Sequence, residues 1–172
     1  MLLILAMMLS CAKLDAQNRE WGERSIGGVF SPKAVGFNAL FLRPNKHFSS
    51  FDLTVDMSGL TEGDSVKPGI KAAFHHDIPL FERDCNGFPL CIYAGPGVVA
   101  GYVHDKVSLK YGFMAGLSCN AGVRFGMWHH VTIAVEWQLD LAFILEGEST
   151  VSIYKAGLTH SYWPFLNLSY EF

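Results

Sequence analysis

Charged residues are scarce in this chain of 172 residues: only 17% are Asp, Glu, Lys or Arg, against about 25% in average soluble domains. No segment contains the ~18 consecutive apolar residues of a membrane-spanning helix, although 50% of the residues are hydrophobic. The net charge of −3 shows no basic excess, which excludes the usual kind of nucleic-acid-binding domain. The apolar and aromatic content also excludes a disordered chain. The composition therefore predicts one ordered domain with its apolar residues spread along the chain.

The first residues have the features of a targeting segment. Residues 1–12 are apolar over the length of a secretory signal, and Ala16 before Gln17 supplies a small residue for cleavage. We therefore expect residues 1–16 to be removed as a signal peptide and residues 17–172 to form one exported domain. A competing interpretation makes Cys11 a lipidated residue.

Cysteine is also sparse, and no Cys-x-x-Cys pair is present, so the sequence does not predict a structural zinc site. Export to an oxidising compartment permits disulfides, and Cys85 and Cys91 flank a short polar segment. We therefore expect a disulfide between Cys85 and Cys91. Cys119 has no evident partner and is expected to be a small apolar residue, either buried or facing lipid.

A helical period is absent after residue 16, and a period of two takes its place. In the segment 131–143, apolar side chains at odd positions alternate with polar or small ones at even positions, as in a strand with two different faces. Segment 107–125 repeats the pattern. Shorter stretches complete a set of eight predicted strands, at 24–30, 35–41, 51–57, 70–75, 93–103 and 166–172. Longer connections are expected at 58–67, 78–89 and 146–162, with a bend at Gly95-Pro96-Gly97.

Two all-β architectures fit this pattern. A soluble barrel buries its apolar faces, whereas a membrane barrel turns them to lipid and fills its interior with small or polar residues. The longest predicted strands reach the ~9–11 residues that cross a bilayer at a tilt. Aromatic residues also gather near the strand ends, as in an interfacial girdle. We therefore predict a closed eight-stranded antiparallel up-and-down transmembrane barrel, with a soluble barrel as the alternative.

The polar faces of neighbouring predicted strands carry opposite charges. Because a buried charge is costly unless it is paired, we expect these side chains to form an interior network of ion pairs. Eight strands enclose a lumen that side chains or one small ligand can fill, so no wide pore is predicted. The expected network consists of Lys110, Arg124, Glu136, Asp140 and Glu171.

The last predicted strand ends in an aromatic residue, and Leu168, Tyr170 and Phe172 share its apolar face. This ending resembles the C-terminal signal of bacterial outer-membrane barrels, which the barrel assembly machinery recognises. The segment 91–103 and the Ala16-Gln17 junction are similar to those of small outer-membrane barrel proteins of Bacteroides-like bacteria. The resemblance covers the mature chain in pattern but only these segments in residues. It implies an eight-stranded barrel in the outer-membrane lipid, and it supplies no catalytic residue.

Histidine doublets at His75-His76 and His129-His130 invite comparison with a metal site. Adjacent residues on a strand point to opposite faces, so neither doublet chelates a metal through both rings unless it lies in a turn. His75 and Asp77 share a face, but the sequence supplies no third ligand for them. We therefore expect neither a metal nor another cofactor.

The leading functional expectation is a structural or surface-interaction protein of the outer membrane. It is expected to be a monomer, with the loops 58–67 and 146–162 available to an extracellular partner. One alternative is a narrow channel or carrier for small apolar molecules. Another is a membrane-embedded lipid-modifying enzyme, because His160-Ser161 resembles part of the outer-membrane lipid A deacylase site. Adjacent residues diverge on a strand, however, so we expect no enzymatic activity.

Overall fold

A computed structural model describes residues 21–42, 47–57, 68–85, 88–104, 111–127, 130–146, 150–154, 158 and 163–172. Within these ranges no helix is long and apolar enough to cross a membrane. The strands are β1 (Arg24–Ser31), β2 (Ala34–Leu42), β3 (Phe48–Asp56), β4 (Gly69–Cys85), β5 (Phe88–His104), β6 (Tyr111–Gly126), β7 (Val131–Glu146), β8 (Thr150–Ile153) and β9 (Phe165–Glu171). The prediction of an all-β domain is confirmed.

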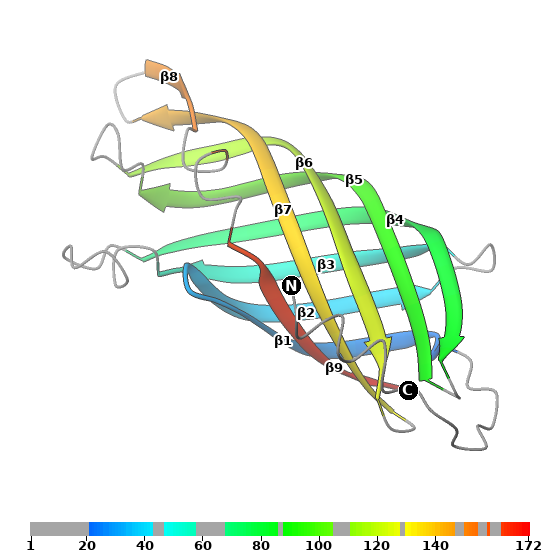
Figure 1. The fold of residues 1–172 in the computed structure, drawn as a ribbon. Helices are drawn as coiled ribbons and strands as arrows, with labels where there is room; N and C mark the ends of the chain where they lie inside the picture. The colour runs from blue at the N-terminus through cyan, green and yellow to red at the C-terminus, as the bar shows by residue number, and fades with distance from the viewer. Residues whose placement is uncertain are drawn as a thin grey trace.

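The strands form one antiparallel sheet whose pairings make a ring (Figure 1). Each strand from β1 to β7 pairs with the next, and β9 pairs with both β7 and β1. The eight predicted strands correspond to the ring. The ninth strand, β8, lies in the segment expected to be a loop and pairs with residues 143–146 at the end of β7.

Neighbouring strands are staggered around the ring. In one direction from Ile26, the paired residues lead through Tyr170 to Val131 on β7. In the other direction they lead to Leu141, through Ala39, Phe51, Phe74, Val98 and Leu117. The two paths reach β7 about ten residues apart, so the strands are displaced along their axes as the ring is followed.

The expected long connection at 78–89 is wrong, because most of it is strand. β4 continues to Cys85 and pairs with the first residues of β5. Pairing shifts between Pro79 and Phe81, which leaves Leu80 as an extra residue. Pro79 has no N–H to donate to the ladder, so a bulge beside it is physically reasonable. This part of the strand was not predicted, because its charged residues and its proline interrupt the period-two pattern.

The expected Cys85–Cys91 disulfide is absent from the structure. The β4–β5 register places Cys85 opposite Phe88 and Cys91 opposite Glu82. The two cysteines are therefore offset by three residues along the hairpin, or about 10 Å at the rise of a strand. That offset is too long for a disulfide, whose Cα atoms lie within about 7 Å.

The outer face of the ring is apolar and the enclosed face is largely polar. In β7 the even-numbered side chains from Thr132 to Ile144 are buried, and the odd-numbered ones from Val131 to Leu145 are half-buried or exposed. The exposed large side chains of the ring include Phe37, Leu53, Phe74, Val98, Leu117, Leu141 and Leu168. The buried polar ones include Asp52, His75, Asp77, Asn120, Arg124, Glu136, Asp140 and Glu171.

Three apolar clusters lie inside the ring, and the two larger ones lie toward opposite ends. The cluster around Phe48 and Tyr93 also contains Leu40 and Cys91, with Trp21 and Leu42 packed against it. The other contains Ala73, Val99, Val103, Met114, Ala142, Ile144 and Tyr154. The register places the first cluster near the chain termini and the second near the end where β8 is attached. Much of the buried polar set lies between them.

Candidate functional site

The enclosed polar side chains form the candidate site, which we call the interior network. At the end near the termini, Arg124 of β6 donates to Glu171 Oε1 of β9 at 2.5 Å, and both side chains are only 3% exposed. Thr132 donates to the same oxygen at 2.6 Å. The Trp21 ring lies 4.4 Å from the Arg124 guanidinium carbon, measured to the ring centroid. The Glu171 carboxylate thus has a charged and a neutral donor in a dry environment.

A second ion pair crosses the ring toward the opposite end. Lys71 Nζ of β4 donates to Asp140 Oδ2 of β7 at 2.7 Å. Ser118 Oγ and Gln138 Nε2 donate to Asp140 Oδ1 at 2.7 and 2.9 Å. Three donors therefore hold the Asp140 carboxylate in its ionised, accepting form.

The structure brings together only some of the residues expected in the network. Arg124 pairs with Glu171, but Asp140 pairs with Lys71, which was not among the expected members. Glu136 accepts from the Tyr93 hydroxyl at 2.8 Å. Lys110 lies outside the described residues. The sequence places Lys71 on the polar face of a predicted strand, which indicates an enclosed side chain. Its pairing with Asp140 could not be predicted, because it depends on the stagger that brings β4 opposite β7.

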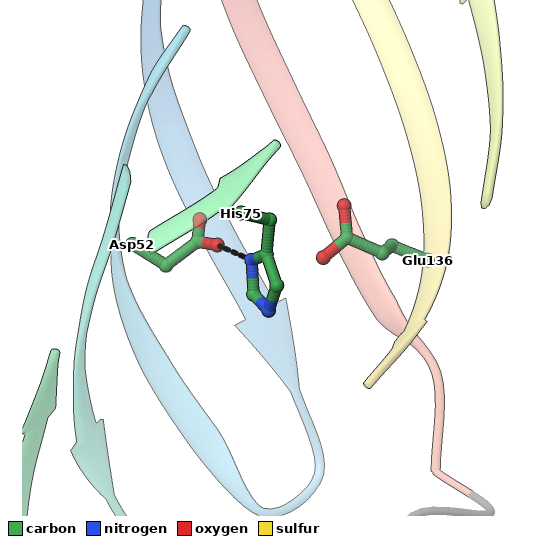
Figure 2. A group of neighbouring side chains, drawn as sticks. All are labelled: Asp52, His75 and Glu136. Carbon is green, nitrogen blue, oxygen red and sulfur yellow. Dashed lines mark ion pairs between the residues drawn. The ribbon is translucent and has the colours of Figure 1, made fainter. Parts of the chain in front are cut away.

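Between the two ion pairs lies a group of three buried side chains: Asp52 of β3, His75 of β4 and Glu136 of β7. Figure 2 shows His75 between the two carboxylates, with its Nδ1 directed at Asp52. The Nδ1 to Asp52 Oδ2 distance is 3.8 Å, which is too long for a hydrogen bond. One potential ligand atom from each residue lies within 4.8 Å of the other two. We call Asp52, His75 and Glu136 the central triad.

The hydrogen bonds around His75 determine its neutral tautomer. Because Asp140 is an acceptor, Ser118 Oγ uses its single hydrogen toward Asp140 Oδ1. Ser118 Oγ then accepts from His75 Nε2, which lies 2.9 Å away. In a neutral imidazole with Nε2–H, the lone pair is on Nδ1. In this tautomer the lone pair faces Asp52 Oδ2 at 3.8 Å.

The triad lies in a region rich in carboxylates. Asp52 Oδ1 accepts from Asn38 Nδ2 at 2.6 Å, and Asp77 Oδ2 accepts from Ser50 Oγ at 2.8 Å. The other oxygen of each carboxylate, Asp52 Oδ2 and Asp77 Oδ1, is buried without a hydrogen-bond partner. Within the described part of the chain, Asp52, Asp77 and Glu136 form no ion pair with Lys or Arg. The centre of the ring thus has more negative than positive side chains.

Two glycines of β5 make room for this region. Gly97 lies opposite His75, and a Cβ added to it would lie 2.3 Å from His75 Cδ2. A Cβ on Gly95 would lie 2.6 Å from Asp77 Oδ1. The pairing of β5 with β6 is regular from Gly95 to Gly97, so the expected bend is not seen in that register. These glycines provide space for the side chains of the neighbouring strand.

The remaining expected positions fall on the outer face or outside the described residues. Leu168, Tyr170 and Phe172 are exposed on one face of β9 and the residue after it, and Cys119 is exposed on β6. His75 and Asp77, considered from the sequence as two possible ligands without a third, are not the group that converges: His75 lies with Asp52 and Glu136, and Asp77 accepts from Ser50. Residues 1–16 with Cys11, loop 58–67, His129 and His160-Ser161 lie outside the described residues.

The sequence did not predict the central triad because its three members come from separate strands. Asp52 and Glu136 were recognised as polar-face residues, but only the register of the whole ring brings them to the level of His75. Comparison with known proteins gives no matching family model, no matching curated protein and no matching solved structure.

Proposed function

We propose that this chain is an integral membrane protein of the bacterial outer-membrane type, in which the ring strands close into a barrel. Its role is structural or that of a surface-interaction protein, and it has no wide pore. The observation that supports the proposal most is the distribution of side chains, with large apolar ones outside and most polar and titratable ones enclosed. That distribution is typical of a barrel surrounded by lipid.

The extent of the apolar outer face strengthens the proposal. Exposed Phe, Leu, Ile or Val side chains occur on every strand of the ring. Monomeric proteins in water rarely expose contiguous apolar patches above a few hundred square ångströms. A surface of this kind around the whole ring favours contact with acyl chains.

The stagger of about ten residues supports closure with tilted strands. Eight-stranded barrels require such a displacement, and their strands tilt by about 35–45°. A barrel of this size has an interior just wide enough for side chains. Here two ion pairs and three apolar clusters occupy it, which favours a lumen closed to solutes over a diffusion pore.

The two ends of the ring differ in their connections. At the end near the termini, the strands are joined by segments 43–47, 86–87 and 127–130. The opposite end carries the short connection 32–33 and the longer ones 57–68, 105–110 and, on either side of β8, 147–149 and 154–164. Longer loops of outer-membrane barrels face the outside. Val151 and Ile153 of β8 are exposed at this end. We assign the surface-interaction role to this end.

Reconstitution tests the proposal. The mature chain should fold into lipid vesicles, float with them in a density gradient and migrate anomalously on a denaturing gel until boiled. Vesicles that contain it should remain as tight to K⁺ as protein-free vesicles. Folding of the chain without lipid or detergent into a water-soluble monomer would contradict the membrane assignment, and rapid K⁺ efflux would contradict the closed lumen.

A double variant in β8 tests the surface-interaction role separately. Val151→Ser with Ile153→Ser should leave the gel behaviour and flotation of the protein unchanged, because neither side chain is enclosed. Crosslinking on intact cells should lose any product that depends on this end. Identical products from the parent and the variant would argue against β8 as the contact.

A further inference from the structure

We propose that the central triad binds one divalent transition-metal ion inside the ring. The ligands are His75 Nδ1 and one carboxylate oxygen each from Asp52 and Glu136. The ion links β3, β4 and β7 and neutralises buried negative charge. This inference goes beyond the proposed function and does not depend on what surrounds the outer face.

The first argument is the state of the donor atoms. His75 is fully buried, and its Nδ1 has no hydrogen-bond partner. Asp52 Oδ2 is also buried and unpartnered, and the two atoms face each other at 3.8 Å. Two electron-rich atoms in this arrangement repel each other unless a positive charge lies between them. Glu136 offers a carboxylate oxygen that lies within 4.8 Å of the ligand atoms from Asp52 and His75 (Figure 2).

The second argument is the orientation of the imidazole. Metal-bound histidines usually donate their other ring N–H to a neighbouring acceptor, which selects the tautomer. His75 has such an acceptor in Ser118 Oγ, which is in turn held by the ion-paired Asp140. The series of hydrogen bonds that runs from Lys71 through Asp140 and Ser118 to His75 therefore leaves the lone pair on Nδ1, on the side of the carboxylates.

The third argument is charge. Asp140 and Glu171 each have a basic partner, whereas Asp52, Asp77 and Glu136 have none among the described Lys and Arg residues. Uncompensated buried carboxylates are costly. A divalent ion at the triad offsets two of these charges directly and lies close to the third, because Asp77 follows His75 on the same face of β4.

The donor set indicates the class of ion. Ca²⁺ and Mg²⁺ prefer oxygen ligands throughout, whereas imidazole with carboxylates suits Zn²⁺ and related first-row ions. Ligand atoms of a tetrahedral zinc site lie about 3.4 Å apart, given bonds of about 2.1 Å. The triad atoms lie within 4.8 Å of one another, so modest side-chain rotations bring them to that spacing, with water as a fourth ligand.

Protons provide the competing explanation. A protonated His75 would pair with Asp52 through Nδ1–H, and a protonated Glu136 would need no cation. Under that explanation the folded protein has no specific affinity for Zn²⁺, so metal titration separates the two accounts.

The test uses the folded full-length mature protein in detergent, stripped with a chelator and titrated with Zn²⁺ by calorimetry. We expect one ion per chain and a rise in the thermal unfolding temperature on binding. His75→Gln and Glu136→Gln should each weaken binding by at least about tenfold. X-ray absorption of the bound zinc should show N/O ligands at about 2.0–2.1 Å, including one imidazole.

His76→Gln is the matched control. His47 Nδ1 and His76 Nε2 lie 3.1 Å apart and form a second place where histidine could bind added zinc. The variant should retain the single site and the thermal shift. Loss of binding in His76→Gln with retention in Glu136→Gln would overturn the proposal, as would the absence of binding by the parent.

Glu136→Gln also distinguishes loss of a ligand from damage to the fold. The amide oxygen of Gln can still accept from Tyr93, so the hydrogen bond at 2.8 Å can persist. Removal of an uncompensated charge should leave the metal-free unfolding temperature equal to or above that of the parent. An equal rise on zinc addition in the parent and in this variant would overturn the assignment of the ligand.

Discussion

Arg124 and Glu171 bridge β6 and β9 across the inside of β7, and Glu171 is the last residue of the last strand. Glu171→Gln leaves the Arg124 charge buried without its counter-ion. Loss of one partner of a buried pair costs about 3–5 kcal/mol. Urea unfolding of the parent and the variant in the same vesicles measures the difference.

The control for this pair is its simultaneous removal. Arg124→Leu with Glu171→Leu deletes both charges, so it should cost less than the sum of the two single changes. Additive costs would show that the two side chains do not act as a pair.

Leu117 and Leu80 are both 67% exposed on the outer face. They therefore allow two positions at different depths in the bilayer to be compared at equal exposure. Leu117 lies near the middle of β6, whereas Leu80 is the bulged residue of β4 beyond the end of β3. In lipid, Leu117→Arg should cost about 2–4 kcal/mol and Leu80→Arg about 0–1 kcal/mol. Chemical unfolding of both variants in vesicles tests this difference. Equal small effects, within about 0.5 kcal/mol, would indicate a surface in water.

Gly97 is expected to be intolerant of a side chain. In Gly97→Ala the new Cβ meets His75 Cδ2 at 2.3 Å and the Phe74 carbonyl oxygen at 2.4 Å. His75 must then move away from Ser118, so the variant should unfold at lower denaturant and bind zinc more weakly. Gly28→Ala is a useful control, because there the closest atoms belong to the movable Phe30 ring. Equal behaviour of the two variants would contradict the packing argument.

Lys33 supplies a pH dependence at the rim of the ring. Burial, followed by the charge of Lys71, lowers the pKa of Lys33 from 10.5 to about 8, against the opposing effect of Asp140 and Asp56. The unfolded chain then binds more protons between pH 8 and 10.5, so stability should rise with pH across that window. Lys33→Met should flatten this part of the profile. A profile of unchanged slope in the variant would assign the titration to another group.

The parts of the fold that depend on local pattern were predictable from the sequence. The alternation around Trp137 and Gln138 places one residue outside and the other inside, and the structure has both where the pattern predicts. The second half of β4 was missed because its proline and charged residues interrupt the alternation. β8 alternates, but its four residues are too few to be recognised inside a polar segment that was expected to be a loop. These segments are strands because a neighbouring strand offers free N–H and C=O groups.

The site was less predictable than the fold. The Lys71–Asp140 pair and the convergence of Asp52 with His75 and Glu136 depend on contacts across the ring. Such contacts follow from the cumulative stagger of several strands, and no single strand encodes that quantity. The motif that contains Gly95 and Gly97 could be recognised in the sequence. The reason for glycine at these positions, the space that His75 and Asp77 occupy, follows only from the structure.

Contact between the outer face and lipid is tested most directly by the fluorescence of Trp137, which is 43% exposed near the middle of β7. The variant for this measurement retains Trp137 and replaces Trp21, Trp128 and Trp163 by Phe. A matched variant retains only Trp21, which packs on Arg124 at the end of the interior. In vesicles with bromine-labelled acyl chains, the account predicts strong quenching of Trp137 and weak quenching of Trp21. Quenching of Trp137 by aqueous acrylamide, without quenching by the brominated lipid, would contradict it.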